Sequence, residues 1–128
     1  MFKRIDHVEI ITPDMEKTID FYIRILGFKL KHRQQGKPES PYKEIVFLSL
    51  GDTMLEIIEM WKQVPQKSES ETQGYRMMAI EVENMDAAIE YLKKHGVDIS
   101  RPPMVLGNNS KRAEIKDCTG FSIELRQW

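Results

Sequence analysis

The chain contains one sequence pattern twice, and this repeat constrains the fold more than any other feature. Residues 6–18, DHVEIITPDMEKT, match residues 76–88, RMMAIEVENMDAA, with His7 opposite Met77 at an offset of 70 positions. The same alignment pairs Gly27 with Gly96 and Glu56 with Glu124, at offsets of 69 and 68. Because chance similarity between two amphipathic segments rarely keeps so constant an offset, the pattern indicates a duplicated module.

Each copy predicts a strand, a helix and three more strands. The first strands, residues 5–12 and 76–83, are short and rich in β-forming residues. Asp14 and Asn84 follow them as N-caps, because their side-chain oxygens can accept hydrogen bonds from the first helical turn. Gly27 and Gly96 end the helices, where a positive φ is common. The remaining strands are predicted at 28–34, 44–50 and 53–60, and at 97–100, 111–117 and 121–127.

Each predicted helix has an apolar stripe at helical spacing. The stripes are Met15, Ile19, Ile23 and Leu26 in the first copy, and Met85, Ala88, Ile89 and Leu92 in the second. The fold class is therefore α+β, with two tandem βαβββ modules in one domain of 128 residues. Module one covers about residues 1–60, a polar linker covers about 61–74, and module two covers about 75–128.

Strand alternation divides the residues of each module between two faces. Leu55 and Ile57 flank Glu56, and Ile123 and Leu125 flank Glu124. These apolar residues are assigned to the helix side. The two glutamates then lie on the opposite face. That face is predicted to contain His7, Glu9, Ile11, Met54, Glu56, Ile58, Met77, Ala79, Glu81, Ser122, Glu124 and Arg126.

Two carboxylates on strands that otherwise look buried need an explanation, because a buried carboxylate is costly unless it is protonated, paired or bound to a cation. In the simplest interpretation this face is open to water and the glutamates are solvated. Matching repeat positions and a histidine on the same face favour a divalent cation, which removes the repulsion. Glu9 and Glu81 lie nearer an edge and are expected to be solvated. Arg126 can pair with Glu124 or meet an anionic substrate.

Two pairs of segments resemble the vicinal-oxygen-chelate superfamily. IDHVEIITPDMEKTIDFYIRILGFKL and LSLGDTMLEII resemble its first module, and MMAIEVENMDAAIEYLKKHGV and DCTGFSIELRQ resemble its second. This superfamily includes glyoxalase I, methylmalonyl-CoA epimerase, extradiol dioxygenases, and fosfomycin- and bleomycin-resistance proteins. The resemblance implies a cupped, mostly antiparallel eight-stranded sheet with the helices outside and a metal ion in the cup. It specifies function weakly, because these relatives perform different chemistry.

The resemblance also implies a set of metal ligands on the first and last strand of each module. Carried over by position, these are His7, Glu56 and Glu124, with Met77 where metal-binding relatives usually have a histidine. The implied cofactor is a divalent ion: Ni, Zn, Co or Mn. A thioether is a poor ligand for these ions, so Met77 is expected in the wall of a cavity. The missing second histidine argues against an extradiol dioxygenase.

The resemblance implies two functions from different classes. The first is a glyoxalase-like, lactoylglutathione-lyase-like lyase or isomerase, in which the ion polarises a carbonyl and stabilises an enediolate. In it, Glu56 or Glu124 carries the proton, and Met54, Ile58, Met77 and Arg126 line the substrate pocket. The second is a metal-free small-molecule binding protein that resembles the bleomycin-resistance proteins, as Met77 suggests. An uncommitted structural domain is the third alternative.

The composition indicates which classes of partner are not expected and which cellular compartment suits the chain. The net charge of -1 leaves no basic surplus for phosphates, so no nucleic-acid partner is expected. The N-terminus has no signal-peptide core, and no apolar run is long enough to span a bilayer. The single cysteine, Cys118, suits a reducing cytoplasm. A small-molecule ligand and a homodimer are expected from the resemblance.

Overall fold

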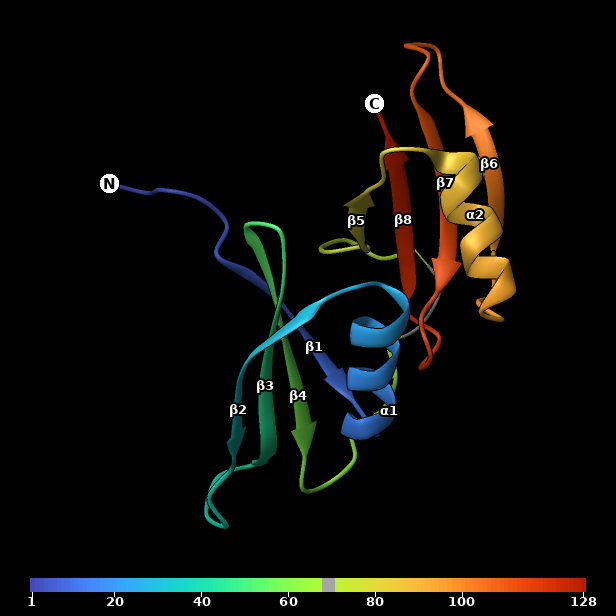
Figure 1. Ribbon diagram of the computed structural model, residues 1–128. Helices are drawn as coiled ribbons and strands as arrows, with labels where there is room; N and C mark the ends of the chain where they lie inside the picture. Colours follow the sequence, from blue (N-terminus) through green and yellow to red (C-terminus); the bar gives the residue numbers. More distant parts are fainter. Residues whose placement is uncertain (68–70) are drawn as a thin grey trace. The chain divides into compact units, whose positions relative to one another are not determined.

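The computed structural model describes residues 1–67 and 71–128. The chain divides into two compact units, residues 1–67 and residues 68–128, each with its own sheet (Figure 1). The division falls within the predicted linker, residues 61–74, of which 68–70 lie outside the described residues.

The first unit has the predicted order of elements. These are β1 (His7–Thr12), α1 (Met15–Asp20) continued by a π-helical turn (Phe21–Ile25), β2 (Lys29–Gln35), β3 (Tyr42–Leu50) and β4 (Thr53–Met60). The four strands form a sheet in the order β1-β4-β3-β2. β1 runs parallel to β4, whereas the other neighbouring strands are antiparallel. The first and last strands of the module therefore lie side by side.

The second unit repeats this topology. Its elements are β5 (Met78–Glu81), α2 (Met85–Lys94), β6 (Arg101–Val105), β7 (Lys111–Lys116) and β8 (Ser122–Gln127). The strand order is β5-β8-β7-β6, again with the first and last strands parallel. The tandem βαβββ, α+β architecture predicted from the repeat is therefore confirmed, as two four-stranded mixed sheets.

The helices begin and end as the sequence predicts. Asp14 accepts a hydrogen bond from the Lys17 amide at 3.0 Å, and Asn84 accepts one from the Ala87 amide at 2.9 Å. Gly27 and Gly96 follow the helices with φ values of 78° and 71°. No helix among the described residues is long and apolar enough to cross a membrane.

The predicted position of β6, residues 97–100, was wrong and does not overlap the observed strand. Residues 97–100 are not in a strand, and β6 is instead Arg101–Val105, RPPMV. Two consecutive prolines argue against a central strand, but β6 lies at the edge of its sheet, where a missing N–H does no harm. Its pairing with β7 is irregular between Arg101 and Met104.

The predicted stripe of the first helix was also incorrect. Met15 is buried, but Ile19, Ile23 and Leu26 are half-buried. The buried residues are Met15, Thr18, Phe21, Tyr22 and Ile25. Before the π-helical turn, Thr18 is buried in place of Ile19, with its hydroxyl 2.6 Å from that of Thr12. A π-helical turn holds more residues than an α-helical turn, so the buried positions also shift after Asp20. In α2, Met85, Ile89 and Leu92 are buried as predicted and Ala88 is half-buried.

The core of each unit fixes which way the glutamates point. Leu55 and Ile57 are 2% and 0% exposed, and their cross-strand partners Leu48 and Val46 are fully buried. Ile123 and Leu125 are buried in the same way in the second unit. Because side chains alternate along a strand, Glu56 and Glu124 lie on the opposite faces of their sheets, as the sequence predicts.

We expect Leu48→Ala to lower the free energy of unfolding by about 2–5 kcal/mol, because a fully buried side chain is removed and a cavity remains. Leu30 is its cross-strand partner on the edge strand β2 and is 52% exposed, so Leu30→Ala is the matched control, with a change within about 0.5 kcal/mol. Urea denaturation followed by circular dichroism measures both. Equal losses for the two variants would contradict this description of the core.

Candidate metal centre

Three ligand-type side chains of the first unit converge on one face of its sheet. His7 and Glu9 come from β1, and Glu56 comes from the neighbouring strand β4, directly opposite Glu9. The His7 Nε2 atom lies 3.0 Å from Glu56 Oε2 and 3.3 Å from Glu9 Oε1. One ligand atom of each residue lies within 4.8 Å of the other two.

The histidine ring is held by contacts on its other side. Asp6 Oδ2 lies 2.9 Å from His7 Nδ1, and the ring packs edge-on against Phe47 with 5.8 Å between centroids. The hydrogen bond to Asp6, followed by the one to Glu9, raises the pKa of His7 above its ordinary value. A carboxylate on Nδ1 is the arrangement that orients metal-binding histidines in proteins, because it leaves Nε2 facing the ion. Asp6 therefore holds His7 in a ligand orientation.

The electrostatics around Glu56 favour a cation. Glu56 is 8% exposed, and burial raises the pKa of its carboxyl above the ordinary value. The negative charge of Glu9 raises it further, and His7 partly offsets both effects. A divalent ion removes the repulsion between the two carboxylates. One imidazole nitrogen and carboxylate oxygens also suit Zn, Ni, Co or Mn. The residues present therefore fit the ion that the sequence implies.

Glu124 has a different environment in the second unit. Its carboxylate pairs with Arg112 at 3.2 Å and with Arg126 at 3.3 Å. Arg112 also contacts the buried Glu114, and the Arg126 guanidinium lies 4.3 Å from the centroid of the Trp128 ring. The pairing of Arg126 with Glu124 is one of the two alternatives left open by the sequence. That Glu124 is a metal ligand stays a prediction.

The sequence missed several residues that the structure brings to these sites. The sequence patterns do not predict Asp6 or Arg112 as site residues, and they predict a solvated Glu9. The Glu9 side chain is 59% exposed, yet it lies 3.3 Å from His7. The signal for Arg112 was present in KRAEIKD, because alternation places it on the same face as Glu114. The signal for Glu9 was its two-residue spacing from His7, but its contact with Glu56 depends on the strand register.

The predicted pocket residues are divided between the units. In the first unit, Met54 lies opposite His7, and Ile58, which is 6% exposed, lies opposite Ile11. In the second unit, the half-buried Met77 precedes β5 and its sulfur lies 4.0 Å from Arg76 Nη1; Arg126 lies on β8. That all four line one substrate pocket stays a prediction.

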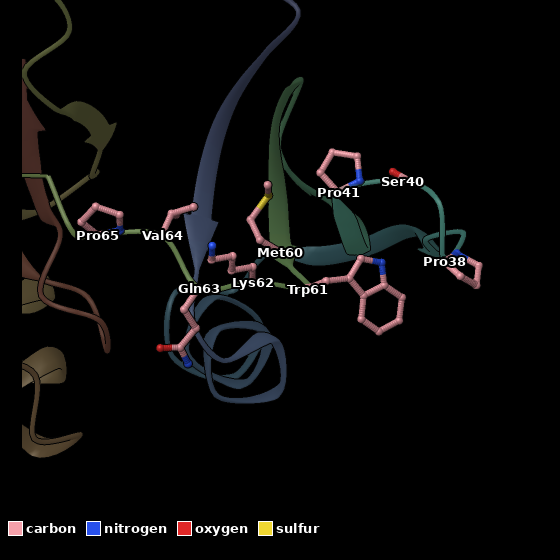
Figure 2. Close-up of a pocket in the computed structure, with 9 residues that line it drawn as sticks. All are labelled: Pro38, Ser40, Pro41, Met60, Trp61, Lys62, Gln63, Val64 and Pro65. Atoms are coloured by element: carbon pink, nitrogen blue, oxygen red, sulfur yellow. The ribbon is translucent and has the colours of Figure 1, made fainter.

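A groove in the first unit lies away from the metal-ligand cluster. It has a volume of about 630 Å³ and is lined by Pro38, Ser40, Pro41, Met60, Trp61, Lys62, Gln63, Val64 and Pro65 (Figure 2). Met60 is four residues beyond Glu56 on β4, which corresponds to about 13 Å along the strand. None of the three residues of the metal-ligand cluster lines this groove, so the groove does not identify the chemistry.

Comparison with known proteins assigns the family. Residues 4–125 match the model of the Glyoxalase/Bleomycin resistance protein/Dioxygenase superfamily. The chain belongs to this superfamily. It is 32% identical to human mitochondrial methylmalonyl-CoA epimerase, over 97% of the chain and 73% of that protein. It is 30% identical to lactoylglutathione lyase of Escherichia coli, over 95% and 90%.

Solved structures of the superfamily have the same fold. A glyoxalase family protein from Enterococcus faecalis superposes with a TM-score of 0.84 and 29% identity, covering 98% of each chain. The family predicted from the repeated segments is therefore confirmed. The similar enzymes support a lyase-like or isomerase-like role in general terms, and they do not specify the reaction of this chain.

We expect Asp6→Asn to lower the pKa of His7 toward its ordinary value, because the contact with Asp6 is the largest cause of the increase. NMR titration of the His7 ring protons in chelator-treated protein measures the change. Asp20→Asn is the matched control, since it removes the same charge at the pair that Asp20 forms with Arg24. An unchanged His7 titration in Asp6→Asn would show that Asp6 does not hold the ring.

Proposed function

We propose that the protein is a glyoxalase-like, metal-dependent lyase or isomerase that acts on a small molecule with two adjacent oxygen atoms. The observation that carries this proposal is the contact of 3.0 Å between His7 Nε2 and the buried Glu56 carboxylate, with Asp6 on the opposite ring nitrogen. The similarity to a lactoylglutathione lyase and to an epimerase supports the same class of chemistry.

The residues of this chain would bind the ion and move a proton. His7 and Glu56 supply ligands, and Asp6 keeps the imidazole aimed at the ion. A bound divalent ion supplies Lewis-acid polarisation of a carbonyl, which makes the neighbouring C–H acidic. Glu56 or Glu124 then accepts that proton and returns it to a neighbouring atom, as general base and general acid. Glu124 is the second candidate because it occupies the position of the second module that corresponds to Glu56.

The proposal includes a small-molecule substrate, a cytoplasmic location and a homodimer. The single Cys118 supports the compartment, and the resemblance of the sequence to the superfamily supports the dimer. Solution mass measured by light scattering tests the oligomeric state. A strict monomer at working concentration would remove the dimer from the proposal.

A metal-free small-molecule binding protein is the second candidate function. Two observations favour it: Met77 occupies a family ligand position, and Glu124 already has two guanidinium partners. A binding protein of this kind would gain thermal stability from an apolar or cationic small molecule and would not respond to metals. A thermal-shift screen of divalent ions against small ligands separates the two functions.

We expect the wild-type protein, purified without chelator, to contain Ni, Zn, Co or Mn, or to take up one of these ions on titration. His7→Ala removes the only predicted imidazole ligand and should abolish this uptake. His95→Ala is the matched control, because His95 caps the end of α2 in the second unit. Elemental analysis by mass spectrometry measures the metal content. A wild-type protein that neither contains nor takes up any of the four ions excludes the metal-dependent function.

A further inference from the structure

The carboxylates of Glu9 and Glu56 are placed where like charges repel. The register of β1 and β4 puts the two residues directly opposite each other, on strands about 4.8 Å apart. Like charges in directly opposite positions destabilise a sheet. The structure places the His7 ring against both of them, so one imidazole faces two acidic side chains.

The two distances from His7 to the carboxylates are compatible with neighbouring ligand atoms on one metal ion, and one ligand atom of each of the three residues lies within 4.8 Å of the other two. Metal–ligand bonds of about 2.1 Å place adjacent ligand atoms about 3.0 Å apart at a right angle and about 3.4 Å apart at a tetrahedral angle. His7 Nε2 lies 3.0 Å from Glu56 Oε2 and 3.3 Å from Glu9 Oε1. The Glu9 side chain is 59% exposed, whereas that of Glu56 is 11% exposed. The cluster therefore opens to solvent on the Glu9 side, where an ion can enter.

The second unit provides an internal comparison, because it contains the same strand pair without this cluster. There Ala79 is the residue opposite Glu124, where the first unit has Glu9 opposite Glu56. The charge of Glu124 is neutralised by Arg112 and Arg126, which are themselves cross-strand partners.

The corresponding partners in the first unit are apolar. Ile58 follows Glu56 by two positions, as Arg126 follows Glu124, and Ile45 is the cross-strand partner of Ile58. The second unit thus neutralises one acid with two fixed guanidinium groups. The first unit instead combines two acids on facing strands with one histidine, whose other ring nitrogen contacts Asp6, and it has isoleucines where the arginines would be. A divalent cation would complete this charge balance.

We infer that Glu9 is a direct ligand of the divalent ion, so that His7, Glu9 and Glu56 form a three-ligand site contained in the first unit. This inference rests on the proposed function, in which His7 and Glu56 bind the ion. The inference accounts for three ligands although Met77 stands where a histidine ligand is expected. Glu9 supplies the third ligand in place of that histidine. Glu124 is then not required as a ligand.

The inference is tested by titrating Co²⁺ into chelator-treated protein, followed by calorimetry and by visible absorption of the bound ion. We expect Glu9→Gln to weaken binding at least about 10-fold and to change the Co²⁺ absorption spectrum, because one charged oxygen ligand is lost. Glu39→Gln is the matched control, since Glu39 is an exposed residue in the turn between β2 and β3 of the same unit. It should leave both the affinity and the spectrum unchanged.

A second variant distinguishes a ligand from a nearby charge. Glu9→His restores a ligand atom but no negative charge, so it should recover much of the affinity with an altered spectrum. If the wild type binds Co²⁺ and Glu9→Gln binds it equally well, the inference is overturned while the proposed function stands. Failure of Glu9→His to recover any affinity lost in Glu9→Gln would also overturn it, because Glu9 would then act by charge alone. If the wild type binds no divalent ion, the proposed function and the inference fail together.

Discussion

Parallel pairing of the first and last strand of each unit is the interaction on which the candidate site depends. In the first unit it brings β1 beside β4, and the register sets Glu9 opposite Glu56 and His7 opposite Met54. A slip of one residue would turn Leu55 and Ile57 toward the site and the glutamates toward the helix. That register is secured by burial, because Leu55 and Ile57 are almost completely covered on the helix side. The hydrophobic core therefore positions the polar cluster on the opposite face.

Each unit has a glutamate on its last strand, and the charged neighbours of this glutamate differ between the two units. Arg112 and Arg126 neutralise Glu124 with two guanidinium groups fixed on the neighbouring strand and on its own strand. Glu56 has Glu9 and a histidine beside it, and both ring nitrogens of His7 contact carboxylates. The charge of Glu124 is balanced without any added ion. The charges around Glu56 would be balanced further by a divalent cation. Duplication has therefore given two sheets of one topology with different electrostatic roles.

Much of this could be predicted from sequence where the pattern is local or repeated. The order of elements, the caps at Asp14 and Asn84, and the bounds of β4 follow from residue types along the chain. The strand β6 was misplaced because VDIS has better strand residues than RPPMV, and its edge position was not apparent from the sequence. Alternation and the repeat predict that His7 and Glu56 share one face, and the structure brings their side chains within 3.0 Å of each other. The approach of Glu9 to Glu56 was missed because it requires the register of two strands more than forty positions apart.

The methionine at position 77 has a limited consequence once the first unit is considered by itself. It removes a potential imidazole, and a thioether does not replace that ligand for Ni, Zn, Co or Mn. The remaining donors in the first unit are one nitrogen and two carboxylates, which is a more oxygen-rich set than two histidines would give. Such a set shifts preference away from Zn and toward harder ions, and it leaves positions open for the oxygens of a substrate. In the proposed function, Met77 therefore bears on which ion the site would favour more than on whether an ion could bind.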